Sequence, residues 1–327
     1  MGKVTGCIRF RFFSVNVPTQ LLKATSNRYT NMNPDDLLSK YTAGERDFSL
    51  ADLSGVDLKH VNLRGVDFTH ANLSQANLSH ANLVRATLGT ADLQQAELEG
   101  ANLQNSDLSG ADLMGANLNA ANLSFADLTG ADLSGANLMI AALVGADLNG
   151  ASLYEAKCIG VHLQGANLIG ANLCRSNLCA SYLYETDLSE ANLDRANLQK
   201  VLYNEKTIFP QGFDPIEAGA YLIAPHVSLT GVNLRGVYLS GVNLHQANLS
   251  RIDLSEANLL WADLSQADLS GANLSGANLS GANLSGANLS DVKLDGANLS
   301  GTTMPNGELH NVQTIEWNGA NSSSKCS

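Results

Sequence analysis

A large apolar residue, nearly always Leu, recurs at every fifth position from Phe48 to Tyr203 and again from Leu229 to Leu309. Two positions before each one stands Ala or another small residue, so the repeat reads A-(D/N)-L-x-x. In an α-helix a step of five residues turns the chain by roughly 500°, which would scatter the leucines around the circumference. In a straight strand an odd period would send every second Leu to the opposite side. The chain must therefore turn a corner in every repeat.

Four such corners close a roughly square coil of about twenty residues, and stacked coils stand about 4.8 Å apart, the spacing of paired strands. Stacking places the leucines in a continuous dry column and turns the residue before each Leu outward. The sequence therefore predicts an all-β fold, a right-handed quadrilateral parallel β-solenoid. We number the four faces of a coil in chain order, starting with the face that holds Phe48.

Runs such as Ala-Asn-Leu-Ser-Gly at 272–276 and 277–281 resemble the repeats of the pentapeptide-repeat family, and the resemblance covers most of the chain. The segment Gly-Glu-Arg-Asp-Phe at 44–48 is similar to the start of the solenoid in many members. The interruption at 207–215 and the end at 302–307 resemble cyanobacterial members. The resemblance implies the solenoid fold, but the family hosts unrelated roles, so it implies no single function.

The repeat divides the chain into segments. Residues 204–227 interrupt it, because Pro210, Pro215 and Pro225 and a one-residue shift of register require an inserted loop. The predicted segments are a basic extension at 1–31, a capping helix at 32–45, a solenoid of about eight coils at 46–203, the inserted loop at 204–227, a second solenoid of about four coils at 228–311 and a disordered tail at 312–327.

A short helix is predicted before the first solenoid. Asn33 is a good N-cap, Pro34 suits the first helical position, and two aspartates follow at the positive end of the helix dipole. Leu37, Leu38 and Tyr41 share one face of this helix. We expect that face to cover the first coil, because an open parallel edge invites aggregation.

Residues 1–31 contain no Asp or Glu and several Ser and Thr, a composition that suits an organelle transit peptide, including one for the thylakoid lumen. The alternative is that translation begins at Met32, and the helix start at Asn33 favours this alternative. We therefore expect a cytoplasmic, cyanobacterial protein, while targeting by residues 1–31 stays open.

Charge and cysteine content restrict the classes of partner. The chain has 31 acidic and 19 basic residues and a net charge of −12, which argues against direct binding of nucleic acid, because phosphate binding needs clustered Lys and Arg. Its 5 cysteines are odd in number and form no C-x-x-C pair, which indicates a reduced chain. No apolar run approaches the ~20 residues of a membrane span, so membrane insertion is not expected.

Catalysis and metal binding are not expected either. A solenoid with Leu and Ala inside and small polar residues outside leaves no deep cleft for a substrate. His60 and His80 occupy equivalent positions on adjacent coils, whereas His70 falls on the opposite face. No third ligand shares their column, so we predict a solvated pair, no metal site and no cofactor.

Acidic residues gather on the outward positions of the first two faces. They cover about eight coils at roughly one charge per 4 Å, less than half the density of a DNA duplex. The resembled family includes DNA-mimicking inhibitors of type II topoisomerases that confer quinolone resistance. The alternative is that Asp and Asn are interchangeable turn formers here. The members of this acidic stripe are Asp47, Asp52, Asp67, Asp92, Asp107, Asp112, Asp127, Asp132, Asp147 and Asp187.

Apolar residues replace the usual Ser, Thr, Asn and Gln on the outward positions of three consecutive coils. On the third face these are Met139, Ile159 and Cys179, with Ile140 beside them; on the fourth they are Val144 and Tyr184, with Tyr182 nearby. Stacked exposed apolar side chains are a candidate binding surface. The alternative is that the 204–227 loop folds back on them. Leu260 and Trp261 form a separate apolar pair on the second solenoid.

These patterns together predict a non-enzymatic rod for protein–protein interaction, an adaptor or regulator whose partner is another protein. The alternative function is a DNA-mimic inhibitor of a type II topoisomerase through the acidic faces of 46–203. End-to-end association of two copies also stays open, because each solenoid ends in an edge that another coil can continue.

Overall fold

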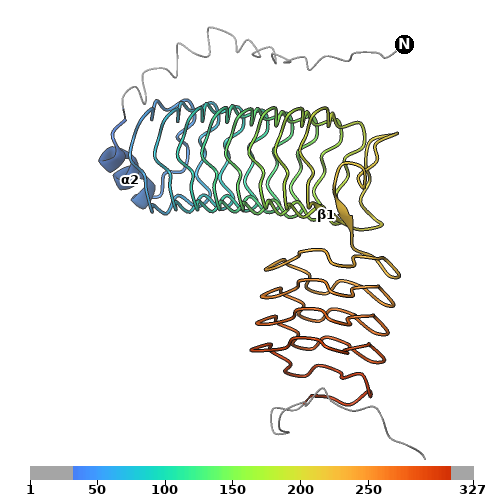
Figure 1. The fold of residues 1–327 in the computed structure, drawn as a ribbon. Coiled ribbons are helices and arrows are strands. Elements are labelled where there is room, and N and C mark those ends of the chain that lie inside the picture. The colour runs from blue at the N-terminus through green and yellow to red at the C-terminus, as the bar shows by residue number, and fades with distance from the viewer. Residues whose placement is uncertain (1–31, 311–327) are drawn as a thin grey trace, which may run out of the picture. The chain divides into compact units, whose positions relative to one another are not determined.

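The computed structural model describes residues 32–310, so the predictions for 1–31 and 312–327 lie outside the described range. The chain forms two compact units, Met1–Tyr221 and Leu222–Ser327. We call their repeat regions the first and second solenoids, and each is described by itself. Figure 1 shows the coils of the first solenoid stacked between helix α2 and strand β1.

Each coil holds twenty residues. Parallel bridges join the outward positions of the first solenoid and end with Asp187↔Ile208, which spans 21 residues. From Asp47↔Asp67 to Tyr182↔Leu202 the offset is twenty residues. The same offset runs from Ser228↔Asn248 to Asn283↔Thr303 in the second solenoid. The four-sided parallel β-solenoid predicted from the period of five is therefore present, while its handedness stays a prediction.

Most faces contribute a single bridged residue rather than a strand. Asp147 is an example, since its N–H donates to the Ala126 carbonyl at 3.0 Å and its carbonyl accepts from Leu128 N–H at 2.7 Å. Longer pairing among residues 32–310 occurs between β1 (Leu202–Tyr203) and β2 (Tyr221–Leu222). The face is this short because a turn begins directly after each Leu.

The corners are four-residue turns. After Leu128, the Ala131 N–H donates to the Leu128 carbonyl at 3.0 Å, and the third residue, Gly130, has a φ of 66°. A positive φ at this position is the mark of a type II turn and favours Gly. Many corners nevertheless carry a larger residue there, including His60, Phe125 and Trp261. These substitutions bear on the candidate site below.

The core is the predicted dry column. Leu128 and Ala131 are both 0% exposed, and the same holds for the Leu and Ala positions of most coils. Phe48 and Phe68 pack against each other at the start of the column, with ring centroids 6.1 Å apart and the rings tilted by 52°. Cys158 fills one Leu position and is buried. Each coil therefore stabilises its neighbours by burying small and large apolar side chains in alternation.

Helix α2 (Pro34–Thr42) precedes the first coil. The Asn33 side chain accepts a hydrogen bond from the Asp36 N–H, which caps the helix as the sequence indicates. Leu37 is fully buried, and the Tyr41 hydroxyl donates to the Arg64 carbonyl at 2.9 Å. The helix thus packs on the first coil. No helix within residues 32–310 has the length and apolar character needed to cross a bilayer.

Residues 204–221, which we call the closing segment, pack on the last coil of the first solenoid. The Thr207 hydroxyl donates to the Leu183 carbonyl at 2.6 Å, and the Phe209 ring meets Tyr203 edge-on with centroids 5.2 Å apart. Phe213 stacks on Phe209 in turn. This part of the predicted loop is therefore held against the solenoid rather than a free linker.

A candidate interaction surface on the fourth face

The predicted third-face column is formed as expected. Bridges join Asn137, Lys157 and Asn177, which places Met139, Ile159 and Cys179 at one corner of three consecutive coils. All three side chains are half-buried. Ile140 is more open, because 59% of it is exposed.

One residue of the predicted patch must be corrected. Tyr184 is only 7% exposed, because Asn204 and Thr207 of the closing segment bond to the backbone of its neighbours Glu185 and Leu183. Burial raises the pKa of the Tyr184 hydroxyl, and this hydroxyl has no hydrogen-bond partner among the described residues. Tyr184 therefore belongs to the packed end of the solenoid rather than to a binding surface.

Tyr182 and His162 form an aromatic pair on the fourth face. Their rings stack with centroids 4.5 Å apart, and the Tyr182 ring meets Tyr184 at 6.3 Å. Desolvation by burial lowers the pKa of His162 below its usual 6.5. A neutral imidazole against a phenol ring makes this end of the face largely apolar.

Sequence reasoning missed three residues of this surface. Phe125 is 56% exposed at the corner after the fourth face, and Ala142 and His162 lie on the face itself. The signal was present in the bridged column, which is Asn in the first four coils and then changes to Ala142, His162 and Tyr182. Counting replacements of the usual Asn would have found it.

The surface is a continuous uncharged strip. Residues 119–125, 139–145 and 159–165 form the fourth face and its two corners on three consecutive coils, and they contain no Asp, Glu, Lys or Arg. On the fourth coil residues 179–184 are also uncharged, but the corner ends in Glu185, which pairs with Lys206 at 2.9 Å. We call these four uncharged segments the apolar strip. Val144 and Met139 are half-buried in it, while Phe125 and Ile140 are exposed.

The backbone at the two exposed residues is strained. Ile140 has a φ of 50° and Phe125 a φ of 59°, a region that a β-branched or bulky side chain rarely adopts. Gly145 accommodates Phe125, because a Cβ on Gly145 would lie 2.7 Å from the phenyl ring. Gly160 is close to Ile140 in the same way, at 3.3 Å. Both large side chains thus lean over a glycine of the next coil.

The closing segment does not account for these exposed side chains. Its hydrogen bonds and ring contacts reach residues 183–188 and 199–203 on the last two coils. Ile140 lies two coils away from Leu183, about 10 Å along the solenoid, and is still 59% exposed. The closing segment therefore packs on the strip only at its end, at Tyr184.

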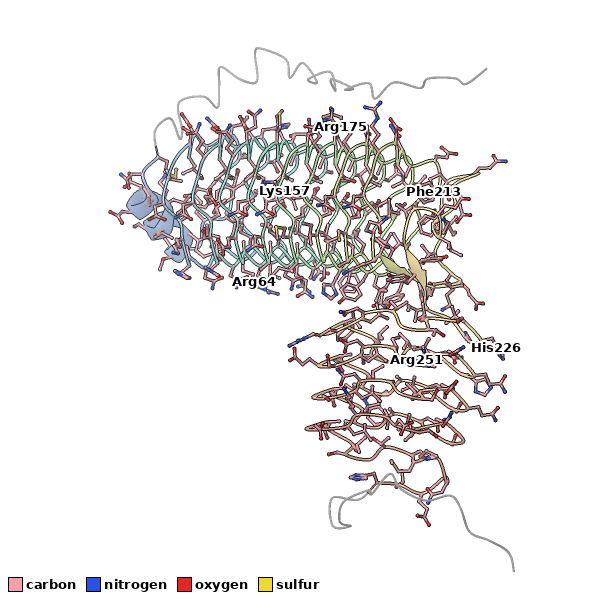
Figure 2. All side chains as sticks on the ribbon, viewed as in Figure 1. Arg64, Lys157, Arg175, Phe213, His226 and Arg251 are labelled. Carbon is pink, nitrogen blue, oxygen red and sulfur yellow. The ribbon has the colours of Figure 1, made fainter. Side chains whose placement is uncertain are left out.

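Charges border the strip unequally. On one side stand Asp107, Asp127, Asp147 and Asp187 of the first face, bridged through Asn167. On the other side stand Asn137, Lys157 and Asn177 of the third face. Arg64 and Arg175 in Figure 2 mark two opposite corners of the first solenoid: Arg64 shares the corner of Val144 and Phe125, while Arg175 lies across the coil.

The acidic residues also build their own turns. Asp127 accepts from the Thr129 N–H, and Asp147 accepts from the Asn149 N–H and the Asn167 amide. Asn137 accepts from the Met139 N–H in the same manner. Asp and Asn therefore accept the same hydrogen bond from the backbone of the turn. This supports the interpretation that the acidic residues of the stripe are turn formers.

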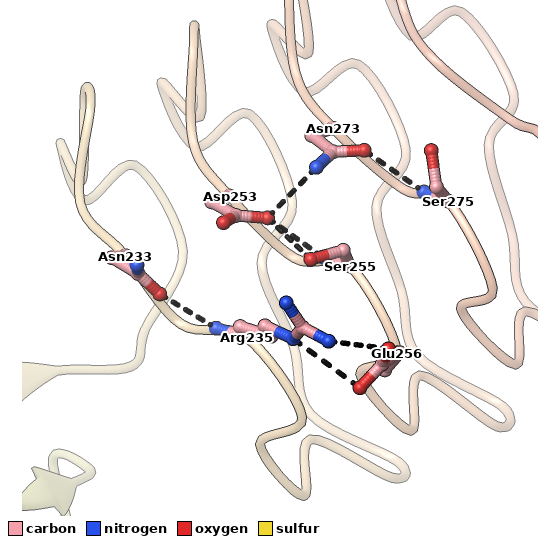
Figure 3. Close-up of polar contacts among 7 residues, drawn as sticks. All are labelled: Asn233, Arg235, Asp253, Ser255, Glu256, Asn273 and Ser275. Atoms are coloured by element: carbon pink, nitrogen blue, oxygen red, sulfur yellow. Dashed lines mark hydrogen bonds and ion pairs between the residues drawn. The ribbon is translucent and has the colours of Figure 1, made fainter.

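Figure 3 shows this turn chemistry in the second solenoid. Asp253 Oδ1 accepts from the Ser255 hydroxyl and N–H and from the Asn273 amide. The hydrogen bonds from Ser255 hold the pKa of Asp253 below its usual value, and those from Ser270 do the same for Asp268. The nearby Arg235 and Glu256 form an ion pair at 2.7 Å.

The histidines and cysteines form no metal cluster in the described part of the chain. His60 and His80 stack as predicted, with centroids 5.0 Å apart and rings 8° from parallel, and His70 contacts Thr90. Within residues 32–310 no group of three or more His, Cys, Asp and Glu lies close enough to hold a metal ion. Cys158 and Cys179 are free thiols, whereas Cys174 is disulfide-bonded, so the prediction of a reduced chain is wrong at Cys174.

The two residues of the apolar pair on the second solenoid differ in exposure. Trp261 is 68% exposed with a φ of 59°, while Leu260 is half-buried. The indole leans over Gly281, where a Cβ would lie 2.6 Å from the ring. Trp261 thus repeats the arrangement of Phe125 over Gly145, but no apolar strip surrounds it.

Comparison with known proteins identifies the repeat. The family profile described as pentapeptide repeats matches residues 47–83, 81–119, 116–153, 131–168, 162–199, 233–271 and 262–301. No curated protein sequence matches.

Three solved structures are similar to this chain to different degrees. The chain is 31% identical to HetL from the cyanobacterium Nostoc sp. strain PCC 7120, which is described as a pentapeptide repeat protein involved in heterocyst differentiation regulation. The match covers 85% of this chain and 100% of HetL, with a TM-score of 0.51. A pentapeptide repeat protein of the cyanobacterium Cyanothece 51142 is 39% identical over 28% of this chain and 63% of its own, with a TM-score of 0.28. QnrB1, a plasmid-mediated fluoroquinolone resistance protein, is 19% identical over 52% of this chain and 91% of its own, with a TM-score of 0.47.

Proposed function

Because this chain belongs to the pentapeptide-repeat family, we propose that it is a non-enzymatic scaffold that regulates another protein by binding it through the apolar strip. The likeness to HetL extends over all of that protein, which is described as involved in the regulation of heterocyst differentiation. A regulatory role in a cyanobacterial cytoplasm is the corresponding proposal for this chain.

The observation that carries the proposal is the pair of exposed side chains at strained corners. Ile140 and Phe125 occupy turn positions where Gly is favoured, yet neither is buried in the core. Many other corners share this positive φ, which costs on the order of 1–3 kcal/mol per residue, so within the first solenoid the large exposed apolar side chain is what sets these two corners apart. A partner that covers these side chains would explain why the protein has exposed apolar residues that lower its own stability.

The test is a double substitution, Phe125→Gly with Ile140→Gly. Glycine removes the strain of the left-handed backbone conformation. It also makes the unfolded chain more flexible, which costs roughly 0.5–1 kcal/mol of stability per residue. The melting temperature should therefore stay the same or rise, while recovery of the partner from native cell extract should fall. Gln75→Gly with Gln95→Gly is the matched control, because both glutamines have a positive φ and are exposed on the corner of Arg175.

If the strip variant recovers every partner that the parent protein recovers, the strip is not the binding surface. If both pairs of variants lose the partner equally, the loss reflects a general change in the solenoid. Only a loss confined to Phe125 and Ile140 supports the proposal.

The alternative proposal, DNA mimicry by the acidic stripe, has a separate test. Changing Asp107, Asp112, Asp127 and Asp132 to Lys should abolish any inhibition of topoisomerase supercoiling, and the inhibition by the parent should weaken as salt rises. If the parent in stoichiometric excess leaves supercoiling unaffected at low salt, mimicry is excluded for the enzyme tested. The turn hydrogen bonds of these carboxylates favour the scaffold instead.

End-to-end association of two copies also stays a proposal. In the last coil of the second solenoid, Leu294 and Leu299 are half-buried rather than buried, unlike Leu274 and Leu279 one coil earlier. Sedimentation over a range of concentrations would reveal such a dimer.

A further inference from the structure

The spacing of side chains along the apolar strip can be compared with the spacing in an α-helix and in a β-strand of a partner. Equivalent side chains of the strip recur once per coil, at the 4.7–4.9 Å spacing typical of paired strands. An α-helix laid along the solenoid axis would present one row of side chains every 5.4 Å, so over three intervals the mismatch is only about 2 Å. An extended strand in that direction presents same-side residues about 6.6–6.8 Å apart, and the mismatch reaches about 6 Å. The spacing favours a helix.

The length of the strip fixes the length of that helix. Four coils span about 14 Å between their first and last bridged residues, which corresponds to roughly three helical turns. Its anchors would follow the i, i+3, i+4, i+7 pattern of an apolar helix face. Phe125 and Ile140, the two most exposed apolar residues of the strip, would lie between these anchors.

The borders of the strip fix the charge of the helix. Asp127 is exposed and Asp147 half-buried on the first face, directly beside Phe125 and Val144. Their hydrogen bonds within the described residues use only Oδ1, so Oδ2 of each carboxylate can accept from a partner. The opposite border offers Lys157 between two Asn residues and has no carboxylate.

We propose that the partner segment is an amphipathic α-helix of about three turns, with an apolar row seated on the strip and Lys or Arg along the edge that meets Asp127 and Asp147. This inference rests on the proposed function and names the chemistry of the partner. The charges orient the helix, and the apolar row holds it.

Two designed peptides of about 14 residues test the inference against the full chain. Both have Leu at the i, i+3, i+4, i+7 and i+11 positions; one has Lys along one edge and the other has Gln in place of those Lys residues. Binding is measured by fluorescence anisotropy at low and moderate salt. The Lys peptide should bind about tenfold more tightly than the Gln peptide at low salt, and this difference should shrink as salt rises.

Substitutions in the protein separate the two contributions. Asp127→Asn with Asp147→Asn keeps the turn hydrogen bonds, since Asn167 occupies the same column, and should remove the advantage of the Lys peptide while leaving the Gln peptide unchanged. Phe125→Gly with Ile140→Gly should weaken both peptides about tenfold or more. Asp112→Asn with Asp132→Asn on the second face is the control and should change neither.

Several results would overturn the inference. The first is that the Lys peptide does not bind at low salt. The second is that the control pair weakens binding of the Lys peptide as much as Asp127→Asn with Asp147→Asn does. The third is that Phe125→Gly with Ile140→Gly leaves binding of both peptides unchanged. A concentration-dependent dimer of the protein alone that this strip variant abolishes would instead identify a second copy as the occupant. Failure of the peptides while the strip variant still loses its cellular partner would reject the helix but keep the proposed function. Retention of the partner by the strip variant would reject the function itself.

Discussion

Ser176 and Ser181 offer a matched test of polar groups in the dry column. Both occupy the inward position that is usually Ala, and they are 1% and 0% exposed. The Ser181 hydroxyl donates to the Cys158 carbonyl at 2.7 Å, whereas Ser176 Oγ has no hydrogen-bond partner within residues 32–310. A buried hydroxyl without a partner costs about 1–3 kcal/mol, while a buried hydrogen bond contributes about 0.5–1.5 kcal/mol.

The two alanine substitutions should therefore have opposite signs. Ser176→Ala removes the unpaired hydroxyl and restores the usual residue, so it should stabilise the first solenoid by about 1 kcal/mol, or about 2–4 °C in Tm. Ser181→Ala removes a formed hydrogen bond and should lower the stability by a similar amount. The gap between the two variants is thus about 2 kcal/mol.

Differential scanning calorimetry measures this gap directly. Because the chain has two compact units, their transitions can separate, and only the transition of the first solenoid should move. Equal shifts of both variants, or a loss of stability in Ser176→Ala, would contradict a buried, unpaired Ser176 hydroxyl. Such a result would show that the Ser176 hydroxyl finds an acceptor, as the Ser106 hydroxyl does at the Leu103 carbonyl.

Three further predictions concern the core, the cap and the pH dependence. Leu128→Asp puts a carboxylate where no partner reaches it and should cost several kcal/mol in chemical denaturation; unchanged stability would contradict the inward position of Leu128. A chain that begins at Arg46 loses the buried Leu37 of α2 and should aggregate in light scattering, whereas one that begins at Met32 should stay soluble; equal solubility would remove the capping role. The folded-state pKa of His162 lies below its usual 6.5, so its stabilising contribution is present above that pH and is lost as pH falls through 6.5 toward the folded value. His162→Asn should flatten that part of the profile of Tm against pH, and an unchanged slope would contradict the burial of the ring.

Much of the fold follows from the sequence because the period of five has few geometric solutions. The inward position of Leu128 and the stacking of His60 on His80 both follow from counting in twenties. The helix start at Asn33 follows from local capping chemistry. These features depend on neighbours whose places the repeat itself determines.

The binding surface is less predictable because exposure depends on contacts outside the repeat. Tyr184 is buried by the closing segment, whose path no periodicity describes. Phe125 was missed because its corner is normally a glycine position, and its exposure depends on how the ring leans over Gly145. The change of the bridged column to Ala142 and His162 could have been read from the sequence by comparing columns rather than single repeats.

A partner protein that binds the apolar strip is proposed to do so through a basic amphipathic helix. A photo-crosslinking amino acid at position 140, compared with one at position 75, tests this proposal most directly in native cell extract. We expect a crosslink to one partner from position 140 and none from position 75. The crosslinked peptide should lie in an amphipathic helix that bears Lys or Arg along one edge. A partner captured equally from both positions, or a crosslinked segment that is acidic or not helical, would contradict the proposal.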